Sequence, residues 1–126
     1  MNVPDDLLYT VEHEWIRRLA GSRFRLGVTD YAQDQLGDVV YVELPKPGKS
    51  VATGDLVAEI ESTKSVGEVY APFDGTITAA NQSVADTPEL VNTSPYEEGW
   101  LVEIEVEPDM GVEGLLDAAA YRELTE

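Results

Sequence analysis

Two β-like runs separated by a short polar stretch constrain the fold of this chain more than any other feature. Apolar residues recur along 56–61 with the period of two that is typical of a half-buried strand. A second run, 66–71, favours strand structure and is closed by Pro72, which cannot donate a backbone hydrogen bond to a sheet. The intervening 62–65 is short enough for a tight reversal. The sequence therefore predicts a β-hairpin with Lys64 at its tip.

Lys64 is a primary amine at this reversal. Most lysines in turns are solvated and have no further role, and the hairpin alone favours that interpretation. The other two lysines, Lys46 and Lys49, lie in the loop 45–49, where two prolines and a glycine predict irregular structure. Lys64 is therefore the best candidate for an amine displayed for chemistry.

Composition excludes several classes of function. The chain has no cysteine and one histidine, His13, which excludes disulfides, thiolate nucleophiles and cysteine- or histidine-rich metal sites, so we expect no bound metal. Any redox-active sulfur must arrive as an added group. Eight basic and 25 acidic residues give a formal net charge of −17, which repels phosphate backbones and argues against nucleic-acid binding. This charge either reflects solubility alone or speeds encounters with partners that have basic surfaces.

Length and hydropathy predict one globular domain over 1–126, with a core at about 7–106 and a helical tail at about 109–125. No apolar run is long enough to span a bilayer, and the acidic start, 1–6, is not a targeting segment. We therefore expect a cytoplasmic bacterial protein that binds no membrane and is a monomer.

Turn and cap signals predict the other elements. A hairpin turn is expected at Gly21-Ser22, and four arginines lie around it in the sequence. They either dock an acidic partner surface or offset nearby carboxylates, and we favour the second interpretation. Thr29 is a good N-cap for a short helix at 30–36 that Gly37 ends. The further expected strands are 24–28, 39–44, 76–80 and 100–106. The tail is expected to pack on the sheets and cover an edge.

Two weaker patterns have competing interpretations. Residues 7–16 alternate like a strand, with Glu12 and Glu14 on the polar face; a solvated strand face fits better than a glycosidase-like acid–base pair. We expect His13 to be a hydrogen-bonded structural residue. A weak repeat, in which 51–57 resembles 84–91 and 37–39 before the first resembles 75–77 before the second, indicates either two similar β units of a barrel-sandwich or a chance match.

Five patches, in order and spacing, resemble the H protein of the glycine cleavage system. They are 9–15 with YT and HEW, 27–33 (GVTDYAQ), 37–45 (GDVVYVELP), 61–72 with ESTK and YAP, and 94–101 (SPYEEGWL). Together they span nearly the whole chain. The tetrapeptide ESTK alone is weak, whereas the ordered set of five is specific.

The resemblance implies a mainly β fold, a barrel-sandwich hybrid like lipoyl and biotinyl domains, with Lys64 bearing lipoic acid in amide linkage. It also implies a non-catalytic carrier that shuttles an aminomethyl group and reducing equivalents. The implied partners are a pyridoxal-phosphate-dependent glycine decarboxylase, a folate-dependent aminomethyltransferase, dihydrolipoamide dehydrogenase and the enzymes that attach lipoate.

By the same resemblance, Glu14 and Glu68 line a cleft where the loaded arm rests, near the amine of the carried group. Family members often have Asp at the position of Glu68, so the longer side chain changes the local geometry.

Several alternatives remain open from the residues. On the same architecture, a biotinyl carrier usually has methionines beside its lysine, whereas Thr63 and Ser65 flank Lys64 here. A lipoyl domain of a 2-oxoacid dehydrogenase is shorter than this chain. Two alternatives come from other classes of protein: an acidic hydrolase using Glu12 or Glu14, and an unmodified adaptor. Both differ from a carrier because each would work without an adduct on Lys64.

Overall fold

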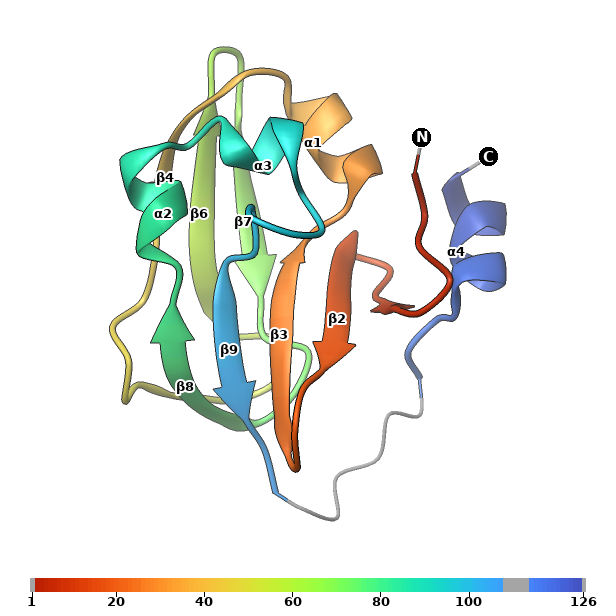
Figure 1. Cartoon of the computed structure of the whole chain (residues 1–126), viewed down its shortest axis with the longest axis vertical. Helices are drawn as coiled ribbons and strands as arrows, with labels where there is room; N and C mark the ends of the chain where they lie inside the picture. Colours follow the sequence, from red (N-terminus) through yellow and green to blue (C-terminus); the bar gives the residue numbers. More distant parts are fainter. Residues whose placement is uncertain (1, 108–113, 126) are drawn as a thin grey trace.

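The chain folds into two antiparallel sheets that face each other, with the helices between residues 30 and 93 at one end and the C-terminal helix at the side (Figure 1). The computed structural model describes residues 2–107 and 114–125. The larger sheet has the strand order β1 (Leu8–Tyr9), β2 (Glu14–Arg18), β3 (Arg23–Val28), β9 (Val102–Glu105), β8 (Gly75–Ala80) and β5 (Ser50–Val51). The smaller sheet has the order β4 (Val39–Glu43), β6 (Leu56–Ser62) and β7 (Val66–Tyr70). The helices are α1 (Asp30–Leu36), α2 (Gln82–Asp86), α3 (Leu90–Thr93) and α4 (Ala118–Thr125).

This arrangement confirms the predicted fold class, a mainly β barrel-sandwich with a helix at 30–36 and a C-terminal helix. The core between the sheets is apolar: Ile60 of β6, Ile77 of β8 and Ile104 of β9 are each exposed by 1% or less. A second cluster, built on Tyr9 and Trp15, lies between the larger sheet and α4. Burying these side chains is the main stabilising contribution to the fold.

The N-cap and glycine signals at the two ends of 30–36 predict α1 correctly. The Thr29 hydroxyl accepts a hydrogen bond from the Ala32 N–H, and the Gly37 N–H donates to the Gln33 carbonyl. Gly37 has a φ of 85°, in the left-handed region that favours glycine.

The strand predicted across 7–16 is wrong, because a turn interrupts it between β1 and β2. His13 has a φ of 68°, and its N–H donates to the Thr10 carbonyl. The Thr10 hydroxyl oxygen also accepts from the backbone of Glu12 and Glu14. Tyr9 and Trp15 are buried as the alternation predicts, but Val11 is 63% exposed and Glu14 is 3% exposed, opposite to the expected faces. Glu14 is therefore not on a solvated face.

The weak repeat does not correspond to repeated structure. Residues 51–57 join β5 to β6, whereas 84–91 cover the end of α2 and the start of α3. Helix α2 begins after Asn81, whose amide donates to the carbonyls of Glu98 and Trp100 and whose oxygen accepts from the Ser83 N–H. The two segments are similar in sequence only.

The C-terminal tail covers a sheet edge, as predicted, but it is less helical than expected. Leu116 pairs with Tyr9 through two backbone hydrogen bonds of 2.7 and 2.8 Å, which extends the larger sheet beyond β1. Helix α4 begins only at Ala118, and 109–113 lies outside the described residues. An exposed strand edge promotes association, so this pairing protects the fold. In the part of the chain that the structure describes, no helix has the length and apolar character needed to cross a membrane.

Gly27 is expected to tolerate no side chain. It pairs with Trp15 across β2 and β3, and a Cβ on Gly27 would lie 2.5 Å from the Trp15 indole nitrogen. Because Trp15 is fully buried, we expect Gly27→Ala to lower the free energy of unfolding by about 2 kcal/mol. Gly21→Ala in the same hairpin is the control. Gly21 has a φ of 66° and open space around it, so backbone strain alone should lower the free energy of unfolding, by about 1 kcal/mol. Urea denaturation measures both, and equal losses would contradict the prediction.

Candidate functional site: a displayed lysine beside an apolar cleft

The β6–β7 hairpin forms as predicted and ends in a turn that satisfies its own polar groups. The Ser62 N–H donates to the Ser65 carbonyl at 2.8 Å. The Ser62 hydroxyl oxygen accepts from the backbone of Lys64 and Ser65. The turn is also fixed to the rest of the molecule, because the Thr63 N–H donates to the Asp38 carbonyl at 3.0 Å. These bonds hold the reversal in one conformation and so hold the Cα of Lys64 in place.

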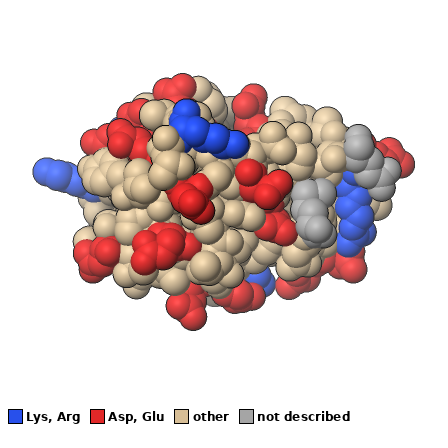
Figure 2. Space-filling view, turned by 90° about the horizontal axis from the view of Figure 1, so that it is seen from above, with Lys and Arg blue, Asp and Glu red and all other residues tan. Residues whose placement is uncertain are grey.

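Lys64 is exposed at the tip of this hairpin, at the end of the molecule nearest α1 (Figure 1). The five ion pairs between described residues involve arginines, so none engages Lys64. Its aliphatic stem lies over Gly37, where an added Cβ would be 3.2 Å from the Lys64 Cε. The absence of a side chain at Gly37 therefore makes room for the stem. Figure 2 looks onto this end of the molecule, where acidic side chains are spread over the face and basic ones are few.

A cleft of about 310 Å³ lies next to the hairpin, between α1 and β7. Its floor is apolar, and Glu12, Gln35 and Glu68 are its exposed members. The residues that line it are Glu12, His13, Val28, Tyr31, Ala32, Gln35, Leu36, Ile60, Gly67, Glu68 and Val69. An apolar floor with a few polar groups at its edge is typical of a binding site for a mainly hydrocarbon group.

Helix α1 supplies one wall of this cleft through two adjacent pairs, 31–32 and 35–36, which are four residues apart and so lie on one helix face. Neither Gln35 nor Glu12 is identifiable from the sequence as a cleft residue by its type alone. The helical spacing could have indicated Gln35. No local signal indicates Glu12, because the 10–13 turn brings it there.

Of the two acidic residues predicted for the cleft, the structure places Glu68 at its edge and Glu14 behind it. Glu68 accepts a hydrogen bond from the Tyr70 hydroxyl at 3.0 Å. The Glu14 carboxylate accepts from the Tyr70 N–H at 2.7 Å and from the Thr10 hydroxyl at 3.2 Å. Glu14 thus joins β2 of the larger sheet to β7 of the smaller sheet, and it is not among the cleft-lining residues in the described part of the chain.

Burial raises the pKa of Glu14 from 4.5 to about 7. The hydrogen bonds from Tyr70 and Thr10 oppose this effect, and the negative charge of Glu12 adds to it. His13 lies on the cleft wall, where burial lowers its pKa and Glu12 opposes the shift. Glu14 therefore changes its charge near neutral pH.

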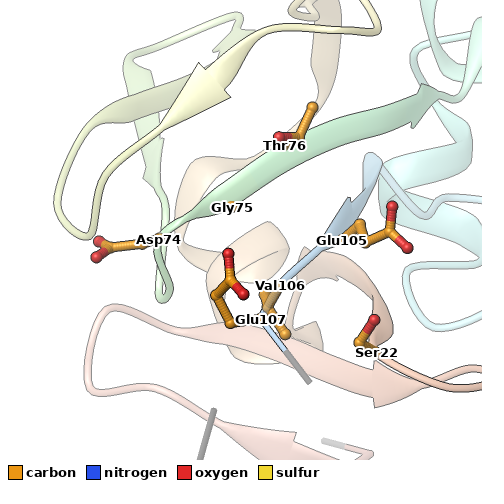
Figure 3. A pocket seen from close by; sticks show the side chains of 7 residues that line it. All are labelled: Ser22, Asp74, Gly75, Thr76, Glu105, Val106 and Glu107. Atoms are coloured by element: carbon orange, nitrogen blue, oxygen red, sulfur yellow. The ribbon is translucent and has the colours of Figure 1, made fainter. Parts of the chain in front are cut away.

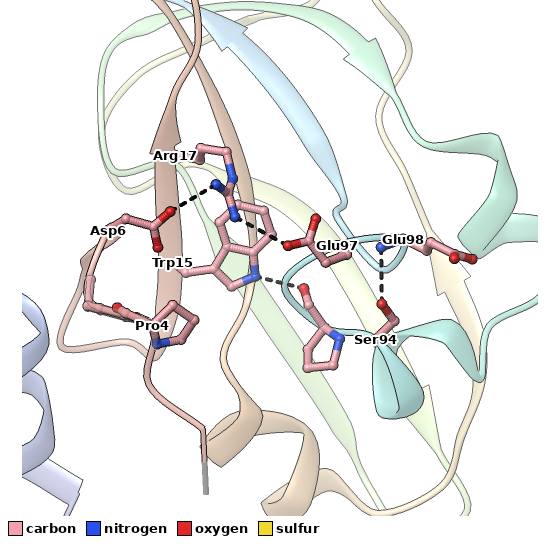
Figure 4. A network of polar contacts seen from close by, with 9 residues as sticks. Pro4, Asp6, Trp15, Arg17, Ser94, Glu97 and Glu98 are labelled. Carbon is pink, nitrogen blue, oxygen red and sulfur yellow. Dashed lines mark hydrogen bonds and ion pairs between the residues drawn. The ribbon is translucent and has the colours of Figure 1, made fainter.

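The predicted role of the arginine cluster, offsetting carboxylates, is confirmed for Arg17, Arg23 and Arg25, whereas Arg18 lies over the ring of Phe24. Arg25 pairs with Glu103 at 2.8 Å, and Arg17 lies 3.3 Å from Asp6 and 3.8 Å from Glu97. Figure 4 shows that the Arg17 contacts surround Trp15, whose indole N–H donates to the Pro95 carbonyl at 2.9 Å. The late motif at 94–101 thus anchors a loop on β2.

A second pocket, of about 350 Å³, lies at the opposite end of the sheets from Lys64 (Figures 1 and 3). Asp74, Glu105 and Glu107 line it with Ser22 and other residues. Asp74 accepts from the backbone and hydroxyl of Thr53, which lowers its pKa. Within 2–107 and 114–125, no group of three or more His, Asp or Glu residues is placed to hold a metal ion. That the chain binds no metal stays a prediction.

A barrel-sandwich that displays one lysine at a hairpin tip has the architecture of the domains that carry lipoyl or biotinyl groups. The glycine cleavage H-protein family model matches residues 7–126. The glycine cleavage system H protein of Mycolicibacterium smegmatis is 52% identical over 123 residues, covering 95% of this chain and 94% of the relative. That of Nocardia farcinica is 50% identical over 123 residues, covering 94% and 93%.

A solved structure gives the same result. The crystal structure of a glycine cleavage system H protein from Mycobacterium marinum superposes with a TM-score of 0.85 at 38% identity, covering 96% of this chain and 97% of that one. The chain belongs to the glycine cleavage H-protein family. The comparisons give no support to a biotinyl carrier or to a 2-oxoacid dehydrogenase lipoyl domain.

Proposed function

We propose that Lys64 carries lipoic acid in amide linkage and that the whole chain acts as one carrier domain of the glycine cleavage system. The observation that supports this most is the position of Lys64: an exposed amine on a self-bonded turn, beside an apolar cleft. The cleft, and the course of the Lys64 stem over Gly37, fit a lysine extended by a hydrocarbon chain. Lipoic acid supplies the sulfur chemistry that a chain without cysteine lacks.

The chain's own residues would then do two things. The hairpin holds the attachment point still, so the arm reaches each partner from a fixed origin, and tethering raises its local concentration at a docked active site. The cleft between α1 and β7 excludes water from the carried group between visits. In this scheme the chain catalyses no step.

We propose that Glu68 faces the amine of the carried group, because its carboxylate lies at the cleft edge and favours a nearby ammonium. The buried Glu14 carboxylate would support that surface from behind, through its bond to the Tyr70 N–H.

The proposed partners are the pyridoxal-phosphate-dependent glycine decarboxylase, the folate-dependent aminomethyltransferase, dihydrolipoamide dehydrogenase and a lipoate-attaching enzyme. The family places the chain with the enzymes of the glycine cleavage system. A cytoplasmic location, a monomeric state and the absence of nucleic-acid binding stay predictions.

The intact mass of protein purified from its native host tests this function. We expect a mass increase of one lipoyl group per chain, and fragmentation should locate it on Lys64. A biotinyl adduct, or an unmodified chain from cells that grow by degrading glycine, would contradict the proposal.

A further inference from the structure

The C-terminal helix reaches the wall of the cleft through one buried hydroxyl. Tyr121 of α4 is fully buried, and its ring stacks on Tyr9 with centroids 4.6 Å apart and planes 12° apart. The Tyr121 hydroxyl lies 2.8 Å from His13 Nδ1 and 2.7 Å from Thr29 Oγ1. Residues 13, 29 and 121 are far apart in the sequence, so this contact joins three separate segments.

Both partners of this hydroxyl belong to the parts of the chain that build the cleft wall. His13 lines the cleft itself, and its ring centroid is 4.6 Å from that of Tyr31, another lining residue. Its backbone has a left-handed φ of 68°, which is costly for a residue with a side chain and must be stabilised by its contacts. Thr29 is the N-cap of α1, the helix that forms one wall.

The hydrogen bonds allow one direction of donation more readily than the other. Thr29 Oγ1 accepts from the Ala32 N–H, and its own proton has Tyr121 as its one acceptor among the described residues. In the arrangement that gives the Thr29 proton an acceptor, the Thr29 hydroxyl donates to Tyr121 and the Tyr121 hydroxyl donates to His13 Nδ1. His13 Nδ1 then carries no proton, so the imidazole is neutral with its proton on Nε2.

We propose that the Tyr121 hydroxyl is a positioning group for the arm-resting cleft. It fixes the tautomer and orientation of the His13 ring and, through Thr29, the start of α1. The C-terminal helix thereby sets how well the cleft shields the carried group. This inference rests on the proposed carrier function.

The stacked tyrosine pair offers a matched test. Tyr121→Phe keeps the ring on Tyr9 and removes the hydroxyl between His13 and Thr29. Tyr9→Phe is the control, because the Tyr9 hydroxyl donates to the Pro4 carbonyl at 2.6 Å, away from the cleft. Each variant loses one buried hydroxyl from the same pair of rings, so general destabilisation affects both.

Two readouts are compared in the full-length lipoylated protein. The first is the ¹⁵N spectrum of the imidazole, which is unambiguous because His13 is the single histidine. The second is the rate at which protein loaded by glycine decarboxylase releases formaldehyde and ammonia. We expect Tyr121→Phe to give mixed His13 tautomers and about fivefold faster release, the factor that corresponds to one lost hydrogen bond. Tyr9→Phe should match the wild type in both.

An unchanged His13 spectrum in Tyr121→Phe would overturn the proposal, and so would equal changes in both variants. If Tyr121→Phe does not fold, Thr29→Ser and Thr29→Val give the same comparison, because only the serine keeps the hydroxyl; equal His13 spectra in that pair would also overturn it. If the chain carries no lipoyl group, the carrier function fails, whereas the His13 spectrum of the unmodified chain still decides whether Tyr121 positions that ring.

Discussion

Replacement of Lys64 by arginine is expected to abolish lipoylation and to reduce glycine cleavage to the level of an assay without this protein. The guanidinium keeps the positive charge but stays protonated, so it is not an acyl acceptor. Since Lys64 is exposed and forms no ion pair with described residues, the free energy of unfolding should change by no more than about 0.5 kcal/mol.

Lys46→Arg and Lys49→Arg are the matched controls, because both lysines lie in the loop before β5 and not at a hairpin tip. Both variants should be acylated normally. Acylation replaces an ammonium by an amide, which takes the formal net charge from −17 to −17 − 1 = −18, so native electrophoresis resolves the two forms. An active Lys64→Arg protein would contradict the assignment of the attachment site.

The second large effect is expected at Glu14. Burial raises its pKa in the folded protein from 4.5 to about 7, so the folded state binds more protons than the unfolded state between these values. The free energy of unfolding should therefore fall as pH rises from about 4.5 to 7. The expected loss is about 3 kcal/mol, complete above pH 7 and absent below pH 4.5.

Glu14→Gln should remove this dependence, because the neutral amide still accepts from the Tyr70 N–H. As pH rises from 4.5 to 8, the free energy of unfolding of the variant should increase by about 3 kcal/mol relative to that of the wild type. Urea denaturation across that range measures this difference. Glu68→Gln is the control, since that carboxylate is exposed and its removal relieves no buried charge. A Glu14 carboxyl that titrates near 4.5 by ¹³C NMR would contradict the prediction.

The parts of the fold that were predictable from sequence are those whose signals are local. The hairpin at 62–65 follows from strand periodicity on both sides of a short polar turn. Helix α1 follows from Thr29 and Gly37, whose caps act within the helix itself. The break at 81–93 depends on a side chain that bonds to distant backbone, because the Asn81 amide donates to the Glu98 carbonyl, and no local pattern reports this contact. The turn at 10–13 is held by local bonds to Thr10, but the alternation of residues 7–16 favours a continuous strand and so hides it.

The candidate site also has one part with a local sequence signal and other parts without one. Lys64 was identifiable because a turn and a motif mark it within a few residues. The cleft was implied only by the family resemblance, because no local pattern shows that α1 packs beside β7. The burial of Glu14 was missed for the same reason: its bond to the Tyr70 N–H joins residues 56 positions apart.

The contacts of the two chain ends affect how this protein can be studied. The Asn2 N–H donates to the Asp30 carboxylate at the start of α1, and Arg122 of α4 donates to the Val3 carbonyl. Figure 1 shows the N- and C-terminal segments side by side next to that helix. An affinity tag or fusion partner on the N-terminal side would therefore be attached close to α1, so kinetic comparisons of loaded protein need material without an N-terminal tag.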